Sequence, residues 1–400
     1  MKISQRAKNV TPSLTLELTA KAKKMKSEGR DVVSFGAGEP DFNTPDYIIT
    51  AAKHALDQGK TKYTPASGIA ELKAAVADKL LRVNHLSYAP AQIVVSNGAK
   101  HSLTNAFAAL VEEGDEVIVP APFWLTYPEL IRLFGGVPVI VNTKKENGFK
   151  LTADELKAAI TPRTRAVVLN NPNNPTGAVY DKAELYALAE VLEKTDVAIV
   201  ADEIYESLNY TGREIVSIAT YSEKIKDQTI IINGVSKTYS MTGWRIGFTA
   251  SNAALAKAMS NMQSHMTSNP NSIAQYATLA AYTSPEGGKF LSEMNESFTR
   301  RRSLIMSELD KIAGLSYVKP DGAFYVLVDL HSVLGKKYEG RTIGSAHEFA
   351  EILLEAKETV VIPCESFGAD GFIRLSYAIS DDDIVKGVRR IGDFVANLKA

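Results

Sequence analysis

The sequence is poor in cysteine and in long apolar runs, and neither sign of charge predominates. Its only cysteine is Cys364, which excludes an internal disulfide and a cysteine-based metal site. The six histidines show no metal-like spacing, so we expect no metal. No stretch reaches the roughly 20 apolar residues that a membrane span requires. Residues 1–14 are partly basic but no apolar run follows them, so we expect no signal peptide.

The 45 basic and 46 acidic side chains nearly cancel. This balance argues against a general attraction to nucleic acid or to an anionic membrane. The chain has 400 residues, of which 45% are hydrophobic and 23% charged, as in an ordinary globular protein of two domains or one large enzyme fold. A cytoplasmic enzyme fits these properties, and so does a soluble binding protein.

Short apolar runs alternate with helical patterns in the middle of the chain. The runs are rich in Val and Ile and mostly do not alternate with polar residues, which is typical of strands covered on both faces. The alternation of strands and helices therefore predicts an α/β fold with a mostly parallel, seven-stranded sheet. The predicted strands are Ile93–Ser96, Glu116–Pro120, Pro138–Val141, Ala166–Asn170, Ala198–Asp202, Thr229–Asn233 and Ile246–Ala250.

The two ends of the chain have a different pattern. We expect a large domain of residues 46–285 and a smaller α/β domain that residues 1–45 and 286–400 form together. The elements predicted at the ends are an amphipathic helix over residues 13–28, a long charged helix near residues 286–312, apolar runs at Ala323–Val328 and Phe372–Tyr377, and a closing helix from Asp382 to about Leu398.

The segment that begins at Ser236 follows the predicted strand Thr229–Asn233. A lysine at a strand end, here Lys237, can be partly desolvated against a sheet and used as an amine nucleophile. Eight residues later, Arg245 could return to the same place and offer its guanidinium to a phosphate. The alternative is an unrelated surface lysine and surface arginine. Small and hydroxyl-bearing residues around both favour a site.

Asp202 ends the apolar strand Ala198–Asp202. Burying a carboxylate there is costly unless a cation or a protonated ring nitrogen faces it. The alternative is a helix N-cap, a position that Asp also favours. This segment alone leaves both interpretations open.

The residues Gly98, Ala99 and Lys100 join a predicted strand to a predicted helix. Small residues at such a junction let backbone N–H groups and the helix dipole meet an anion. The segment has neither the phosphate-loop pattern nor a G-x-G-x-x-G fingerprint, which counts against a nicotinamide dehydrogenase. Taken singly, it is a weak signal.

Three further residues each allow two interpretations. Asn174 lies in a turn-rich loop after an apolar strand, where a purely structural loop is the alternative. Trp124 could stack on a planar ring or pack in the core. Arg374 sits mid-strand between apolar residues, which suits a bidentate grip on a carboxylate, although an outward ion pair stays open.

Together these segments resemble the class I aminotransferases among the fold-type-I pyridoxal-phosphate enzymes, and within them the branch of bacterial aspartate aminotransferases found in Bacillus and Thermus. The resemblance covers nearly the whole chain, and it is the joint order and spacing of the motifs that is specific. The matching motifs are Thr11–Thr15, Gly36–Phe42, Lys62–Pro65, the loop around Asn174, Asp202–Tyr205, Ser236–Lys237 and Arg374–Tyr377.

The resemblance implies pyridoxal 5′-phosphate as the cofactor. Lys237 would be the Schiff-base lysine, which also moves the proton between the substrate α-carbon and the cofactor. Asp202 would face the pyridine nitrogen and keep it protonated, which improves the electron sink. Tyr205 and Asn174 would hydrogen-bond the phenolic oxygen, and Trp124 would stack on the ring.

The resemblance also implies a phosphate site and a homodimer with shared active sites. Tyr63 would reach the phosphate of the neighbouring subunit. Some relatives have a serine three residues before the lysine, where this chain has Gly234, so one phosphate contact is in question. The remaining phosphate ligands would be the side chains of Ser236 and Arg245 and the backbone near Gly98, Ala99 and Lys100.

For the substrate, the resemblance implies that Arg374 binds the α-carboxylate, with the Gly38 backbone beside it and Trp124 and Asn174 in contact. No second arginine matches the one that binds the distal carboxylate in the mitochondrial-type enzymes. The resemblance to the Bacillus and Thermus branch implies that this role falls on Lys100 with Thr15.

The reaction expected is ping-pong transfer of the amino group from L-aspartate to 2-oxoglutarate. A broader dicarboxylate, prephenate or aromatic aminotransferase is the main alternative. A pyridoxal-phosphate β-lyase or decarboxylase shares the cofactor, and a non-catalytic binding protein could share the fold. The set of Lys237, Asp202 and Arg374 argues against the last of these, because binding alone needs no Schiff-base lysine.

Overall fold

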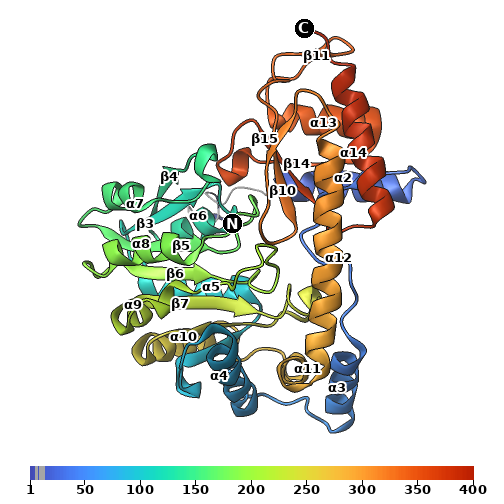
Figure 1. Cartoon of the computed structure of the whole chain (residues 1–400). Helices are drawn as coiled ribbons and strands as arrows, with labels where there is room; N and C mark the ends of the chain where they lie inside the picture. The colour runs from blue at the N-terminus through green and yellow to red at the C-terminus, as the bar shows by residue number, and fades with distance from the viewer. Residues whose placement is uncertain (5–7, 9–13) are drawn as a thin grey trace.

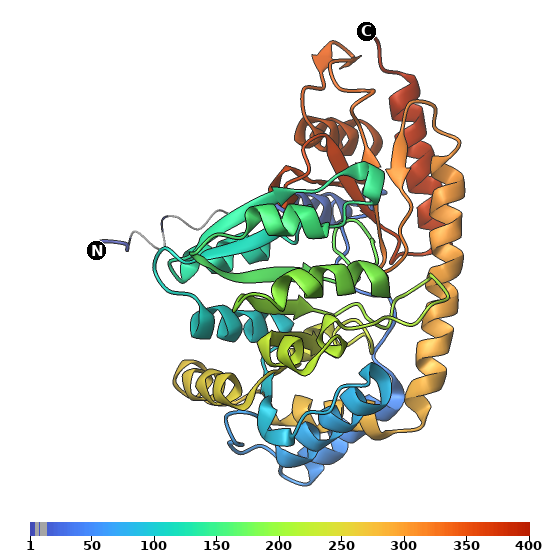
Figure 2. The ribbon, with the colours of Figure 1, turned by 60° about the vertical axis from the view of Figure 1, so that its left-hand side comes forward.

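A computed structural model describes residues 1–4, 8 and 14–400, and for residues 14–19 it describes only the course of the backbone. Within these residues the chain builds two main sheets with helices packed around them, and two short two-stranded pairs (Figure 1). A single long helix, α12 (Glu286–Leu309), runs along one side of the molecule past both sheets, as Figure 2 shows from a second direction.

The larger sheet has seven strands in the order β2-β8-β7-β6-β5-β3-β4. All neighbours pair in parallel except β8, which is antiparallel to both β2 and β7. The sequence-based prediction of a mostly parallel α/β sheet is confirmed, with strand bounds within two residues. The strands are β2 (Ile93–Ser96), β3 (Glu116–Ala121), β4 (Val137–Asn142), β5 (Thr164–Asn170), β6 (Ala198–Asp202), β7 (Thr229–Gly234) and β8 (Gly247–Ala250).

Helices cover both faces of this sheet because alternate strand residues point to opposite sides. Val117 and Val119 of β3 pack toward one face, and Ile118 between them packs toward the other. The first face is covered by α5 (Ala99–Leu110), α6 (Thr126–Leu133) and α10 (Ala253–Met266). The second is covered by α7 (Ala153–Ala159), α8 (Lys182–Leu192) and α9 (Glu223–Gln228).

The strand β4 departs from the pattern of a strand buried on both faces. It lies at the edge of the sheet, and its residues are exposed or half-buried, with Val137 and Ile140 among the exposed apolar side chains. At the other end of the sheet, β2 is fully buried because a further apolar layer covers it. That layer consists of α3 (Asp46–Asp57), α4 (Ala70–Asn84) and α11 (Ser272–Thr283).

The smaller sheet is antiparallel and has the order β14-β15-β10-β9. Its core includes Val328 of one strand, Ile373 of the neighbouring strand and Phe394 of a helix that covers them. The strands are β9 (Ser316–Val318), β10 (Tyr325–Asp329), β14 (Ile362–Pro363) and β15 (Phe372–Ser376), and the helices against them are α13 (Ala346–Lys357) and α14 (Asp381–Ala396). Short pairs are formed by β1 (Val33–Ser34) with β13 (Thr359–Val360) and by β11 (Lys337–Tyr338) with β12 (Arg341–Thr342).

The helices at the chain ends agree with their predicted positions to within a few residues. The helix predicted over residues 13–28 is α2 (Leu14–Ser27), and residue 13 lies outside the described residues. The α12 helix ends at Leu309, earlier than predicted. The closing helix α14 begins where Ser380 caps it through the backbone N–H of Asp383, and its first turn carries three acidic residues that favour the helix dipole.

Candidate active site

The candidate residues converge on a cavity of about 760 Å³ between the carboxyl ends of the large sheet's parallel strands and the smaller sheet. Parallel strands in register bring their ends to one edge, and here Asn170 of β5 pairs with Asp202 of β6. Residues from the predicted site that line the cavity are Gly38, Ala99, Lys100, Trp124, Asn174, Asp202, Tyr205, Ser236, Lys237, Arg245 and Arg374.

Lys237 follows β7 and points into the cavity. Its Nζ donates to the carbonyl oxygen of Gly38 at 2.5 Å, and it lies 5.9 Å and 5.8 Å from the ring centres of Tyr205 and Phe324. Burial lowers the pKa of the Lys237 amine to about 8, although the charge of Glu39 opposes that shift. An amine of this kind is partly neutral near physiological pH, so it can act as a nucleophile and carry a proton.

Asp202 is buried and has two donors. The hydroxyl of Tyr127 donates to Oδ2 at 2.7 Å, and the backbone N–H of Ile204 donates to Oδ1 at 3.2 Å. Burial raises the pKa of the Asp202 carboxyl to about 6, and the two hydrogen bonds oppose that shift. No helix begins directly after Asp202 in this described part of the chain, so the interpretation as a helix N-cap is wrong. Both oxygens keep lone pairs that can accept a further N–H from the cavity.

A cradle for an anion forms where α5 begins. Gly98 has a φ of +87°, and a Cβ there would lie 2.5 Å from Nη2 of Arg245. A Cβ at Gly247 would lie 2.3 Å from the backbone nitrogen of Ala99, so both glycines are required for this close approach. The first-turn N–H groups of α5, the guanidinium of Arg245 and the Ser236 hydroxyl can therefore serve one anion.

Gly234, where some relatives have serine, is explained by the same packing. A Cβ at this position would lie 2.8 Å from both the Cα of Gly247 and the carbonyl oxygen of Ile246. A serine here would require β7 and β8 to separate. This chain therefore has no side-chain hydroxyl at position 234, and the anion cradle depends on its other donors.

Arg374 lies in the middle of β15 and is only 4% exposed. Its Nη1 donates to Oδ1 of Asn174 at 2.9 Å, and its guanidinium lies 4.3 Å from the ring centre of Tyr325. Its Nε has no hydrogen-bond partner among the described residues. A buried arginine with an unpaired donor beside a cavity is suited to a carboxylate ligand, because a guanidinium can bind both oxygens.

Two tyrosines that the sequence interpretation missed complete the cavity wall. Tyr127 holds Asp202, and the hydroxyl of Tyr325 lies 3.0 Å from that of Tyr205. Both are fully buried, and a buried tyrosine hydroxyl usually needs a partner. The only sequence signal for Tyr127 is its place three positions after Trp124, one helical turn from a residue already selected.

Lys100 lies in the first turn of α5 with Nζ 4.9 Å from the ring centre of Trp124. Desolvation and the nearby charge of Arg245 lower the pKa of its amine. Trp124 lies edge-on to Tyr127, with ring centres 5.6 Å apart. Lys100 therefore extends along the cavity wall, in contact with the ring of Trp124.

Among the predicted residues that the structure describes, Gly98 and Tyr63 do not line this cavity. Tyr63 is 90% exposed. The side chain of Thr15 lies outside the described residues, as do residues 11–13 of the same motif.

Features of metal sites and of membrane spans are both missing from the described residues. No three His, Cys, Asp or Glu side chains within the described ranges are grouped closely enough to hold a metal ion. In the same ranges, every helix is too short or too polar to cross a membrane.

Comparison with known proteins gives consistent matches over the whole length. The family model described as aminotransferase class I and II matches residues 30–391. An aspartate aminotransferase of Bacillus subtilis is 48% identical, over 99% of each chain. An aspartate/prephenate aminotransferase of Cereibacter sphaeroides is 46% identical, also over 99% of each chain.

Solved structures agree with these matches. The aspartate aminotransferase of Rhizobium meliloti superposes with a TM-score of 0.96 at 41% identity and covers 100% of both chains. The aspartate aminotransferase of Thermus thermophilus with maleate has a TM-score of 0.93 at 42% identity and covers 98% of this chain and 100% of its own.

Proposed function

This chain belongs to the class I and II aminotransferase family, and we propose that it transfers the amino group of L-aspartate to 2-oxoglutarate, giving oxaloacetate and L-glutamate. The observation that carries the proposal is the convergence of Lys237, Asp202 and Arg374 on one cavity. These residues supply an amine, a carboxylate and an unpaired guanidinium donor from three different strands or strand ends. Binding alone requires no such amine.

Pyridoxal 5′-phosphate is the cofactor of this enzyme class, and the cavity suits it. The cradle at the start of α5 suits its phosphate, and the Asp202 carboxylate suits a protonated pyridine nitrogen. Tyr205 and Asn174 would hydrogen-bond its phenolic oxygen, and Trp124 would offer a ring face. When bound, this group supplies an electron sink for a carbanion at the substrate α-carbon.

The chain's own residues then have distinct roles in the proposed reaction. The Lys237 amine would hold the cofactor covalently, and its Nζ would carry the α-carbon proton. Arg374 binds the substrate α-carboxylate and thereby orients the α-carbon toward Lys237. Asp202, which accepts a hydrogen bond from Tyr127, would pair as a carboxylate with a protonated ring nitrogen. The same site serves both half-reactions, so the kinetics are ping-pong.

We further propose that Lys100 and Thr15 read the distal carboxylate of the substrate. The support is that Lys100 lines the same cavity as Arg374 and that its Nζ lies over the ring of Trp124. Losing a charge-assisted contact costs about 1.5–3 kcal/mol, or roughly ten- to hundredfold in kcat/KM. Lys100→Ala should lose that factor for aspartate and glutamate but little for alanine or phenylalanine, and Thr15→Val should do the same more weakly. Equal losses for all donors would place the determinant elsewhere.

A transamination screen over amino donors with 2-oxoglutarate tests the proposed reaction. Aspartate should have the highest kcat/KM, and borohydride reduction should fix the cofactor to Lys237 when the peptide is mapped by mass spectrometry. The name of the Cereibacter relative gives prephenate as a second candidate acceptor. Glutamate with prephenate as the acceptor therefore belongs in the same screen. If its turnover exceeds that of glutamate with oxaloacetate, the proposed assignment as an aspartate aminotransferase would change.

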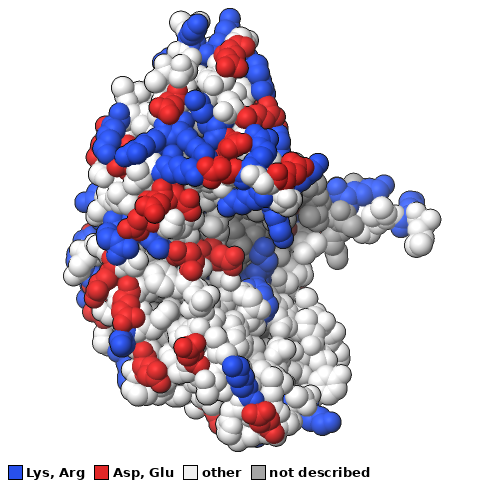
Figure 3. Space-filling model, turned by 90° about the vertical axis from the view of Figure 1, so that its right-hand side faces the viewer, with Lys and Arg blue, Asp and Glu red and all other residues white. Residues whose placement is uncertain are grey.

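A homodimer with shared active sites is proposed from the position of Tyr63. A tyrosine that is 90% exposed in one chain has its hydroxyl free for a neighbouring subunit's phosphate site. On the face in Figure 3, charges gather over the upper half, which holds α13 and α14, while the right-hand part of the lower half is mainly uncharged, as suits an interface.

Mixing Tyr63→Phe chains with Lys237→Ala chains tests this arrangement. One site of each mixed dimer would carry both changes and the other would carry neither, so activity should recover on mixing. Proven mixed dimers without recovery would mean that each site is built from one chain.

The division into a large domain of residues 46–285 and a small domain of residues 1–45 and 286–400 is also a proposal. It is supported by sheet membership, because the seven-stranded sheet lies within the first range and the four-stranded sheet within the last. Limited proteolysis should cut near Asp46 and Glu286 before it cuts within either sheet.

A cytoplasmic location is proposed from the amino-acid and oxo-acid substrates, and cell fractionation tests it.

A further inference from the structure

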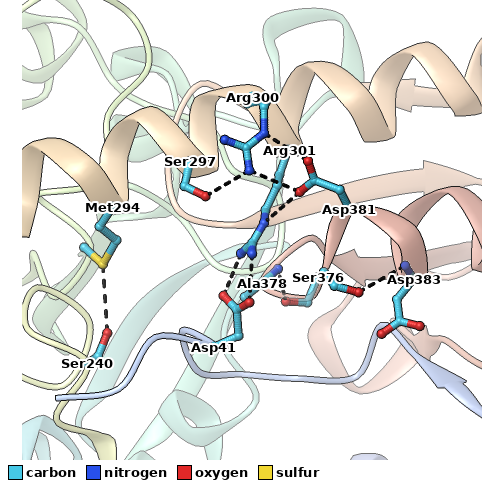
Figure 4. A network of polar contacts seen from close by, with 11 residues as sticks. Asp41, Ser240, Met294, Ser297, Arg300, Arg301, Ser376, Ala378, Asp381 and Asp383 are labelled. Atoms are coloured by element: carbon cyan, nitrogen blue, oxygen red, sulfur yellow. Dashed lines mark hydrogen bonds and ion pairs between the residues drawn. The ribbon is translucent and has the colours of Figure 1, made fainter.

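Helix α12 carries three consecutive arginines, and the middle one is buried at the centre of a polar network (Figure 4). Nη1 and Nη2 of Arg301 donate to the two carboxylate oxygens of Asp41 at 2.6 Å and 2.9 Å. Its Nε donates to Asp381, at the start of α14, at 3.3 Å. All of its guanidinium nitrogens are therefore engaged, and the bidentate pair with Asp41 defines the orientation of both groups.

Two aromatic rings flank the Arg301 guanidinium. The guanidinium carbon of Arg301 lies 5.6 Å from the ring centre of Phe42 and 5.8 Å from that of Phe298. The side chain of Arg301 is 10% exposed and that of Asp41 is 33% exposed. Loss of Asp41 would leave the buried guanidinium of Arg301 with only its Nε contact to Asp381, so the orientation of Arg301 depends on Asp41.

Asp41 lies two residues beyond a segment, residues 36–39, that lines the cavity. Three residues earlier, the carbonyl oxygen of Gly38 accepts from Nζ of Lys237. Just before the segment, the carbonyl oxygen of Phe35 accepts from the backbone N–H of Ser376, two residues beyond Arg374. The segment is thus tied at one end to the strand that carries Arg374 and at the other end to Arg301.

We propose that Arg301 and Asp41 are positioning residues that hold the Gly38 backbone against the substrate carboxylate bound by Arg374. This inference rests on the proposed function, which gives Arg374 and Gly38 their roles. Arg301 does not line the cavity, so it acts through the segment and not on the substrate. Displacing a binding group by about 1 Å can cost up to roughly a hundredfold in rate.

Arg300 offers a matched control on the same helix. It also pairs with Asp381, through Nε at 2.9 Å, but its side chain is 60% exposed and the described contacts do not join it to Asp41. The variants are Asp41→Asn, Arg301→Lys and their combination, against Arg300→Lys. Lysine keeps the positive charge at position 301 but cannot form the bidentate hydrogen bonds of the guanidinium. Asp41→Asn leaves α12 untouched, which keeps the test informative if Arg301→Lys does not fold.

The measurement is the dissociation constant of maleate for the cofactor-loaded enzyme, followed by cofactor absorbance, together with kcat and KM for aspartate. Asp41→Asn and Arg301→Lys should each weaken maleate about tenfold, with KM affected more than kcat. The combined variant should lose little more than either alone, because the two residues act as a unit. Arg300→Lys should change the constant less than about twofold. A purely structural role would lower the melting temperature but leave maleate binding to the folded enzyme unchanged.

Wild-type maleate affinity in both Asp41→Asn and Arg301→Lys would overturn the inference, and so would equal weakening in all three single variants. The wild-type donor screen separates this failure from that of the proposed function. If the wild type accepts no acidic donor, the proposed specificity is wrong. The inference about Arg301 and Asp41 is then tested with the donor that the wild type does accept, by comparing the KM of each variant with the wild-type KM.

Discussion

The partly buried amine of Lys237 should destabilise the cofactor-free protein, so replacing it with methionine should make that protein more stable while abolishing activity. Methionine has a similar length and no charge. Burial lowers the pKa of the Lys237 amine from 10.5 to about 8. Each pKa unit corresponds to about 1.36 kcal/mol, so the protonated amine costs about 3 kcal/mol of folding free energy at pH 7.

The direction of the pH dependence follows from the lowered pKa. Between about pH 8 and 10.5 the unfolded chain still holds the proton that the folded chain has released, so the stability of the wild type rises with pH. Below about pH 8 both states are protonated and the full cost is present. The gain of Lys237→Met over wild type should therefore be about 3 kcal/mol at pH 7 and should disappear as the pH approaches 10.5.

Denaturant unfolding of cofactor-free protein at fixed protein concentration, at about pH 7, 8, 9 and 10, measures this difference. Lys257→Met, which removes an exposed lysine of α10, controls for the loss of one positive charge. A Lys237→Met protein that is no more stable than wild type at neutral pH, or whose advantage does not shrink with pH, would refute the reasoning. In that case the bond to the Gly38 carbonyl compensates for the desolvation of the amine.

Three further predictions concern the cavity wall. Tyr127→Phe removes a hydrogen-bond donor to Asp202, so the pKa of that carboxyl should rise above about 6. The midpoint of the acid limb of the kcat/KM–pH profile should then move to higher pH by about one unit. An unchanged midpoint would mean that another group controls this limb. Asp202→Asn should lose activity far more than cofactor occupancy, measured by absorbance, and near-normal turnover at saturating cofactor would contradict the role given to it. Gly98→Ala places a Cβ 2.5 Å from Nη2 of Arg245 and should weaken cofactor binding about tenfold or more. Gly59→Ala, also at positive φ but with no atom within 4 Å of the new Cβ, should leave cofactor binding unchanged.

The sequence alone determined the elements of the large sheet and the positions of chemistry along it. Buried parallel strands have the pattern of short apolar runs, and a polar residue at the end of such a run, or a few residues beyond it, lies near the carboxyl edge of the sheet. This is why Asp202 and Lys237 could be selected from the residue pattern, and why the strand bounds were predicted within two residues. These signals are local, since strand length and side-chain periodicity depend on near neighbours.

The tertiary structure decided which open alternatives were correct and which distant residues meet. Whether Arg374 faced outward or inward was settled by the four-stranded sheet, which buries it to 4% exposure. Asp202 was separated from the N-cap interpretation only by the course of the chain after β6.

The contacts that the sequence could not indicate join residues far apart in the chain. Tyr127 meets Asp202 across 75 positions, Tyr205 meets Tyr325 across 120, and Asp41 meets Arg301 across 260. Their partners are chosen by how the two sheets and α12 pack together. The periodicity of apolar residues in the sequence does not indicate which distant residues will be in contact. The free energy that favours these contacts comes from burial and charge pairing in the assembled fold.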